Sequence, residues 1–189
     1  MKQSMEALTS SKSNNWCTPT KWLDLVRDVI GDIDLDPASN DLANRYFVNA
    51  KRFYDEDGLD LPWNARSVFL NPPYNKIGNR SGAGTWLEKL LHEHQSGHCN
   101  EAIALSKTAP GYSWWDDLFH EGPQAWQGPM CITRDRISFV HLSWLNQADG
   151  TITVPKGKSN KSKSASSFWY VGPHTNRFFE VFGSVGTVI

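Results

Sequence analysis

The segment SVFLNPPYNK, residues 67–76, sets an asparagine and a tyrosine around two adjacent prolines, directly after an apolar run. Each proline disfavours the helical region for the residue before it, so the chain from Asn71 to Pro73 is predicted to stay extended. In open α/β sheets, ligands bind at the carboxyl ends of strands. Asn71 is therefore expected at the position of a site, with its side-chain amide available for hydrogen bonds.

This corner suits the recognition of an amino group on a flat heteroaromatic ring. Such a nitrogen is a poor nucleophile, because its lone pair is delocalised into the ring. Two acceptors, the side-chain oxygen of Asn71 and the backbone carbonyl of Pro72, suit its two hydrogens and favour a pyramidal nitrogen. Tyr74 is suited to stack on the ring, as when a base is pulled out of a duplex. The alternative is a tight turn with no such role.

Two helices are predicted around the motif. In TPTKWLDLVRDVIG, Thr18 suits the N-cap, Pro19 the first helical position and Gly31 the C-terminal turn. A second helix is predicted after the glycine-rich loop NKIGNRSGAG, because Thr85 and Glu88 have the spacing of a capping box.

Short apolar runs alternate with these helices, which favours an α/β sheet. DIDLDPAS predicts a strand broken by Pro37, and KRFYDEDGL predicts one that ends at a turn of Asp57 and Gly58. The run from Ser67 to Leu70 is typical of a strand buried on both faces of a parallel sheet. The other predicted strands are EAIALS and, in the last third of the chain, MCIT, RISFV, SFWYV and FFEVF.

Length and composition favour one domain of a soluble protein. We assign residues 1–13 to a disordered N-terminus and residues 14–189 to a single domain, with a basic, Ser-rich loop at 155–167. The formal net charge of −1 argues against a wholly basic nucleic-acid packager, but it allows a locally basic face. Three widely spaced cysteines imply no disulfide framework, and no segment resembles a signal peptide or a membrane span. A cytoplasmic location is expected.

A metal site is not predicted. His94, His98 and Cys99 in HEHQSGHC are potential ligands, but their spacing does not match the four-ligand patterns of structural zinc sites. Histidines near a helix C-terminus are favoured by the helix dipole without any metal.

Four motifs in order along the chain, WCTP, LDPAS, DGL…W and FLNPPY, resemble the phage-type DNA N-6-adenine methyltransferase family. The resemblance is clear from Trp16 to Tyr74 and weaker beyond, through RDRISF and the closing strands. It implies a reduced Rossmann-like fold of the S-adenosylmethionine-dependent methyltransferases, with a mostly parallel sheet. The fold is reduced because the chain between Asp36 and Asn71 is too short for two helices and two strands. The catalytic residues implied are Asn71, Pro72, Pro73 and Tyr74.

The resemblance also implies a site for S-adenosylmethionine. LDPAS is similar to the start of the DPACGSG motif of adenine methyltransferases, but Asn40 and Asp41 replace its glycines, which normally allow close backbone approach. Asp57 is an acceptor for the adenine or ribose of the cofactor, or else part of a solvated acidic loop. The implied cofactor-binding residues are Trp16, Thr18, Pro19, Asp36, Pro37, Ala38, Ser39, Asp57 and Gly58.

The implied partner is double-stranded DNA with a flipped adenine, and no obligate protein partner or membrane is expected. Arg80, in the glycine-rich loop, is placed to close over the flipped base, or belongs to a flexible connection. The lysines of the Ser-rich loop either track phosphates or belong to a solvated linker. They are Lys156, Lys158, Lys161 and Lys163.

Two alternatives remain open. One keeps the methyl donor but places the acceptor nitrogen on a cytosine N4 amino group, an RNA base or a protein glutamine, because all present a planar amino or amide nitrogen. The other alternative is a DNA-binding module without turnover, which the absent glycines after LDPAS favour and the intact NPPY opposes. The expected cell is a bacterium or a phage-infected host.

Overall fold

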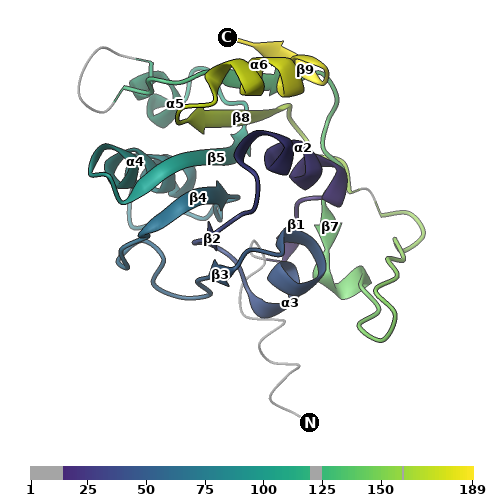
Figure 1. Ribbon diagram of the computed structural model, residues 1–189. Helices are drawn as coiled ribbons and strands as arrows, with labels where there is room; N and C mark the ends of the chain where they lie inside the picture. The colour runs from purple at the N-terminus through teal and green to yellow at the C-terminus, as the bar shows by residue number, and fades with distance from the viewer. Residues whose placement is uncertain (1–14, 120–124, 159) are drawn as a thin grey trace.

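The computed structural model describes residues 15–119, 125–158 and 160–189 (Figure 1). The predicted disordered segment, residues 1–13, lies outside these ranges. The described chain forms a seven-stranded sheet with helices on both faces and a separate two-stranded sheet. The helices are α2 (Thr20–Ile30), α3 (Asp41–Ala43), the π-helix η1 (Asn44–Val48), α4 (Gly82–Gln95), α5 (Ser113–Asp117), the 3-10 helix η2 (Leu142–Trp144) and α6 (Thr175–Gly183). The strands are β1 (Trp16–Cys17), β2 (Leu35–Asp36), β3 (Arg52–Phe53), β4 (Ala65–Leu70), β5 (Cys99–Lys107), β6 (Met130–Thr133), β7 (Val140–His141), β8 (Ser166–Val171) and β9 (Gly186–Val188).

The large sheet has the order β3-β2-β4-β5-β8-β6-β9. The first four strands in this order run parallel. β8 is antiparallel to both β5 and β6, and β9 is antiparallel to β6. The sheet is therefore mixed rather than mostly parallel. β8 enters between β5 and β6, and local sequence patterns carry no information on such long-range pairing.

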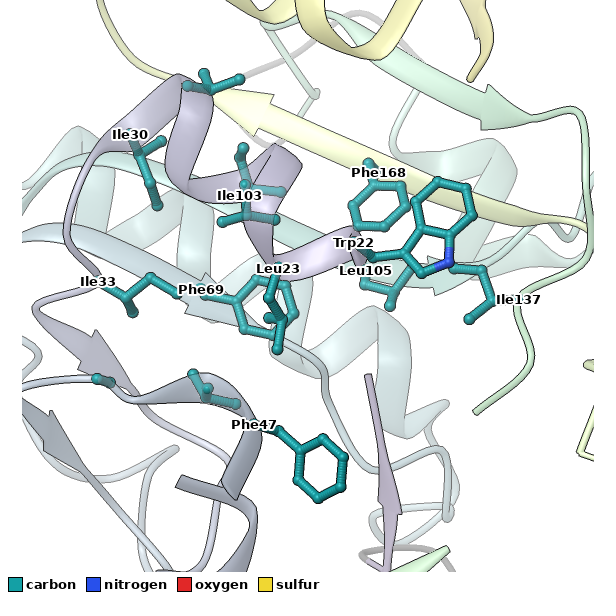
Figure 2. Close-up of a cluster of buried hydrophobic side chains, with 14 of the residues drawn as sticks. Trp22, Leu23, Ile30, Ile33, Phe47, Phe69, Ile103, Leu105, Ile137 and Phe168 are labelled. Carbon is teal, nitrogen blue, oxygen red and sulfur yellow. The ribbon is translucent and has the colours of Figure 1, made fainter. Parts of the chain in front are cut away.

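Alternating side chains of the central strands supply two hydrophobic cores, because successive residues of a strand point to opposite faces. On one face, Phe69, Ile103 and Phe168 pack with the apolar sides of α2 and α6 (Figure 2). On the other face, Leu70 and Trp169 pack with α4 and α5. Burial on both faces holds the ends of β2 and β4 on a rigid platform.

Residues 54–64 join β3 to β4 without a helix, so the predicted short crossover between Asp36 and Asn71 is confirmed. The connection is fixed by Trp63, which is fully buried and donates its indole N–H to the carbonyl of Gly58 at 2.9 Å. Gly58 in turn lies against the turn after β2. A Cβ atom at this position would be 1.9 Å from the carbonyl oxygen of Pro37, so only glycine fits.

The start of α2 differs from the prediction by one residue. Pro19 is the N-cap rather than the first helical residue, and Thr18 does not cap the helix. The prediction relied on residue types alone, whereas the extended backbone of Pro19 delays the first turn. The predicted end is confirmed: Gly31 has φ 71° and donates its N–H to the carbonyl of Arg27 at 2.8 Å.

The start of α4, by contrast, is earlier than predicted. Ser81 is the N-cap, and its side chain accepts a hydrogen bond from the backbone N–H of Gly84. Thr85 lies inside the helix, where its hydroxyl donates to the carbonyl of Ser81 at 3.0 Å. The capping box of Thr85 and Glu88 is therefore wrong, because an earlier hydroxyl occupies the capping position.

The last third of the chain contains one misassigned element. FFEVF is part of the helix α6, not a strand. Phe178, Val181 and Phe182 are buried while Phe179 is exposed, which is helical spacing. Of RISFV, only Val140 lies in a strand, β7. The predicted strands in DIDL, KRF, SVFL, EAIALS, MCIT and SFWYV are confirmed as β2, β3, β4, β5, β6 and β8.

Candidate active site

A cavity of about 490 Å³ lies at the carboxyl ends of β2 and β4. These strands are parallel neighbours, with Leu35 beside Val68, so the residues that follow them meet at one edge of the sheet. The chain passes from β2 to β3 on one side, while β4 and β5 lie on the other. Ligands of open α/β sheets bind where the strand order reverses in this way. The lining residues are Trp16, Cys17, Thr18, Asp36, Ala38, Ser39, Asn40, Ala43, Val48, Phe69, Asn71, Pro72, Pro73, Tyr74, Phe139, Asn160, Lys161, Ser162 and Lys163.

The turn after β2 brings a buried carboxyl group to this cavity. Asp36 is 3 % exposed, and its Oδ1 accepts a hydrogen bond from the backbone N–H of Ala38 at 3.1 Å. Burial raises the pKa of Asp36 to about 7, although the hydrogen bond from Ala38 and the nearby Ser39 side chain oppose this. The ionised form is thus poorly stabilised by the protein itself and suits a cationic group of a ligand.

The backbone after this turn adopts no conformation that requires glycine. Asn40 is the N-cap of α3, and its side chain accepts a hydrogen bond from the backbone N–H of Ala43 at 2.9 Å. Residues 36–48 all have negative φ, so no position there requires the left-handed conformation that favours glycine. Ala43 and Val48 line the cavity from the helical segment that follows. π-helices such as η1 occur frequently at functional sites.

Asn71 to Tyr74 line the cavity from the end of β4. The side-chain oxygen of Asn71 is buried and has no hydrogen-bond partner among the described residues. Buried polar atoms are nearly always paired, so this unpaired acceptor indicates a missing ligand donor. Tyr74 is 40 % exposed, yet burial of its hydroxyl raises the pKa of the phenol above its ordinary value.

The NPPY corner is held by close backbone packing on α4. A Cβ atom at Gly82 would be 2.1 Å from the carbonyl oxygen of Asn75 and 2.8 Å from that of Pro73. Gly82 thus allows the first turn of α4 to support the corner directly. The position of Asn71 therefore depends on the strand before it and on the helix after it.

β1 supplies a second wall of the cavity. It pairs with β7, with Trp16 beside His141. The ring of Trp16 makes edge contacts with His141 at 4.9 Å and with Trp144 at 5.3 Å between centroids. Burial and the neighbouring Asp36 raise the pKa of the Cys17 thiol to about 12, so the thiol stays protonated. This wall is therefore aromatic and uncharged.

Thr18, at the end of this wall, has a buried hydroxyl with no partner among the described residues. The side-chain oxygen of Asn71 and the hydroxyl of Ser39 are likewise buried, unpaired polar atoms of residues that line the cavity. A hydroxyl and an amide oxygen in one cavity suit a ligand with several polar groups.

The remaining wall comes from the C-terminal third. Ser138 and Lys161 form an isolated β-bridge, and the backbone N–H of Ser162 donates to the carbonyl of Ile137 at 2.8 Å. Phe139 lines the cavity from one of these paired segments, and residues 160–163 line it from the other. Part of the basic loop is thus anchored beside the NPPY corner.

Seven predicted site residues are not among those that line the cavity. Asp57 is exposed and has φ 57°, and Arg80 forms an ion pair with Glu88 next to a tight turn that joins Ile77 and Arg80. Their proposed ligand contacts stay predictions. The full set outside the lining is Pro19, Pro37, Asp57, Gly58, Arg80, Lys156 and Lys158.

Several lining residues were not predicted from the sequence. Asn40 follows LDPAS directly, and Cys17 lies between two predicted residues, so adjacency to a motif was an available signal. Phe139 lies in RISFV, whose apolar pattern was assigned only to a strand. Phe69 lies within FLNPPY, and Asn160 and Ser162 flank the predicted Lys161, so the same signal applied to them. Ala43 and Val48 carried no local signal. The missed residues are Cys17, Asn40, Ala43, Val48, Phe69, Phe139, Asn160 and Ser162.

The histidines near α4 have contacts within the protein. Nδ1 of His94 is 2.9 Å from the carbonyl oxygen of Cys99, and Nδ1 of His98 is 3.2 Å from a carboxylate oxygen of Glu93. Within the described residues, no three His, Cys, Asp or Glu side chains gather as a metal-ligand group. No described helix has the length and apolarity to cross a membrane.

Comparison with protein families gives one match. The model described as DNA N-6-adenine-methyltransferase (Dam) matches residues 6–166, which include the walls formed by β1, by the ends of β2 and β4 and by residues 160–163. The comparison with curated proteins finds no match, and neither does the comparison with solved structures.

Proposed function

Since the chain belongs to the DNA N-6-adenine-methyltransferase (Dam) family, we propose that it transfers a methyl group from S-adenosylmethionine to the N6 amino group of adenine in DNA. The observation that carries this proposal is the buried, unpaired side-chain oxygen of Asn71 in a cavity at the carboxyl end of β4. An amino group of the target base is a donor that this oxygen lacks within the protein.

The fold we propose is a reduced Rossmann-like methyltransferase fold in one domain, residues 14–189. Its support is the parallel half of the sheet, where β2 and β4 flank the point at which strand order reverses. The missing helix between β3 and β4 accounts for the short chain between Asp36 and Asn71.

The cavity fits the methyl donor in its chemistry. S-adenosylmethionine supplies a methyl group already activated on a positively charged sulfur, so the protein has chiefly to bind and orient. Asp36 is a buried carboxyl group suited to the cationic amino-acid part, and the unpaired hydroxyl of Thr18 suits a polar group of the same ligand. Trp16 offers an aromatic edge beside them. Asp57 and Gly58 remain proposed contacts for the adenosine part.

In the proposed reaction, Asn71 and the carbonyl of Pro72 accept the two hydrogens of the adenine amino group, and Tyr74 stacks on the base. These contacts position the nitrogen lone pair toward the methyl group, and Pro73 keeps the corner extended. The base has to leave the duplex to enter the cavity, as for other enzymes that act on DNA bases. We expect the DNA to contact the part of the basic loop that lines the cavity, and Arg80 to lie near the flipped base.

The experiment is transfer of labelled methyl from S-adenosylmethionine to unmethylated DNA, RNA or a glutamine-containing protein, followed by mass analysis of nucleosides or residues. The proposal expects label in DNA as N6-methyldeoxyadenosine. Label as N4-methyldeoxycytidine, or in RNA or protein, would reassign the acceptor. Cofactor binding without any transfer would contradict the proposed enzyme.

A further inference from the structure

The structure divides the four lysines of the Ser-rich loop into two pairs. All four are exposed, but Lys161 and Lys163 line the cavity, whereas Lys156 and Lys158 are not among its lining residues. The sequence gives no reason for this division, because all four lie in one polar, Ser-rich segment. A difference in function between the two pairs follows only from their placement.

The cavity pair sits on an anchored backbone. Lys161 is bridged to Ser138, and the backbone N–H of Ser162 donates to the carbonyl of Ile137 at 2.8 Å. The backbone N–H of Ser164 donates to the hydroxyl of Ser162 at 3.4 Å. The backbone that carries these two lysines is therefore held in place at the cavity wall.

The hydrogen bond to Oδ1 of Asp36 comes from a backbone group, the N–H of Ala38, and not from a lysine. Among the ion pairs of the described residues none includes Asp36, and the Ala38 N–H and the nearby Ser39 side chain are the groups that oppose the effect of burial on its pKa. An adjacent ammonium group would favour the ionised form of Asp36. The cavity thus has a carboxyl group at the end of β2 and two lysines in a different part of its wall.

The place of Asp36 bears on which anionic group the lysines bind, the carboxylate of the methyl donor or a phosphate of the nucleic acid. The ammonium and carboxylate groups of an α-amino acid are attached to one carbon atom. If Asp36 binds the ammonium group of the methyl donor, the donor's carboxylate is also near Asp36 and away from the lysines. The anionic oxygens left for the lysines are those of the nucleic acid, whose backbone carries one charge at every nucleotide.

We propose that Lys161 and Lys163 form a phosphate-binding site in the cavity wall, which holds a phosphodiester next to the nucleotide whose base enters the cavity. The inference rests on the proposed function and makes it more specific. Contacts to phosphate position a strand without reading its sequence. This pair therefore orients the extruded nucleotide toward Asn71, whereas Lys156 and Lys158 have no such role.

The test compares the double variant Lys161→Gln/Lys163→Gln with the matched double variant Lys156→Gln/Lys158→Gln. DNA binding is measured by fluorescence anisotropy over a range of salt concentrations, with S-adenosylhomocysteine present. Methyl transfer and the Kd for S-adenosylmethionine are measured separately. Because DNA binding is read without turnover, failure of the proposed activity would not hide the result.

For the cavity pair, we expect the slope of log K against log salt to fall by about 1 per lysine, with a lower kcat/KM for DNA and an unchanged Kd for the donor. The matched variant should keep kcat/KM near the wild-type value. A weaker donor Kd with an unchanged DNA slope would assign the lysines to the donor's carboxylate and overturn the proposal. Equal losses in both variants would also overturn it, since the whole loop would then act as a general DNA-binding surface.

Discussion

Asp36 and Asn71 line one cavity although they are far apart in the sequence. Asp36 is the last residue of β2 and Asn71 directly follows β4, and these two strands are parallel neighbours. One is a buried carboxyl group and the other a buried, unpaired amide oxygen. The first suits a cation and the second a hydrogen-bond donor. The cavity therefore has separate places for a charged methyl donor and for an acceptor amino group.

The burial of Asp36 predicts a pH-dependent cost to stability. Its pKa is near 4 in an unfolded chain, taken as an approximate reference, and is raised to about 7 in the folded protein. Between these values the folded state binds the extra proton, so stability falls as pH rises and the full cost remains above the folded pKa. Asp36→Asn removes this cost, by up to about 4 kcal/mol. Urea unfolding at about pH 5 and at about pH 8 should show a larger increase in the free energy of unfolding of the variant over wild type at the higher pH. The same difference between variant and wild type at both pH values would contradict the account.

The close packing of Gly82 against the NPPY corner predicts that a larger residue at this position lowers activity. Gly82→Ala places a Cβ against the carbonyl oxygens of Pro73 and Asn75 at 2.8 and 2.1 Å, so the NPPY corner has to move. We expect a loss of about 1–3 kcal/mol in the free energy of unfolding and reduced methyl transfer. Gly183→Ala is the matched control, because a Cβ there meets no atom within 4 Å. Equal activity of the two variants would show that the corner does not depend on this packing.

The aromatic edge contacts of Trp16 predict that Trp144 supports donor binding from outside the lining. Trp144→Ala removes the contact between the two rings at 5.3 Å. An aromatic pair contributes about 1 kcal/mol, so the Kd for S-adenosylmethionine should rise about fivefold. Isothermal titration calorimetry measures this, with Phe179→Ala, an exposed residue of α6, as the control. An unchanged Kd for Trp144→Ala would remove Trp16 from the proposed donor site.

Glu93 predicts a stability effect away from the cavity. This 2 % exposed carboxylate accepts hydrogen bonds from Nζ of Lys89 at 2.6 Å and from the backbone N–H of Trp63 at 3.1 Å. Burial tends to raise its pKa, but these hydrogen bonds outweigh burial and lower it. Glu93→Gln should cost about 3 kcal/mol in the free energy of unfolding at neutral pH.

The sign of the shift makes this second prediction more specific. Because the folded pKa of Glu93 is lowered, its contribution is present above the unfolded pKa and is lost as pH falls through the folded pKa. The difference from wild type in urea unfolding should therefore shrink in acid. Glu180→Gln is the control, since its exposed ion pair with Arg177 is worth at most about 1 kcal/mol. A Glu93→Gln effect no larger than the control would contradict the account.

The central features of the site could be predicted because they depend on short-range chemistry. The prolines after an apolar strand place Asn71 at the carboxyl end of that strand, and LDPAS places Asp36 at the carboxyl end of another strand. The same local patterns failed where tertiary packing decides. FFEVF has the residue types of a strand, but packing of Phe178 and Phe182 against the sheet selects the helix α6.

The walls of the cavity were harder to predict, since they join segments far apart in the chain. Phe139 and Lys163 reach the site through the pairing of residues 137–138 with residues 161–162. No sequence pattern in either segment predicts that the two segments pair. Likewise, the replacement of glycines by Asn40 and Asp41 departs from the motif of adenine methyltransferases. In the structure, this turn has negative φ throughout, so its backbone forms without glycine.

The most direct test of the account is the effect of Asn71→Ala on methyl transfer and on donor binding, measured on the same preparation. The unpaired oxygen of Asn71 is the acceptor proposed for the adenine amino group, so its removal should lower kcat by about 100-fold or more. The Kd for S-adenosylmethionine should stay near the wild-type value, because the donor is assigned to Asp36 and the β1 wall. Wild-type turnover in the variant, or loss of donor binding together with turnover, would contradict the role given to Asn71.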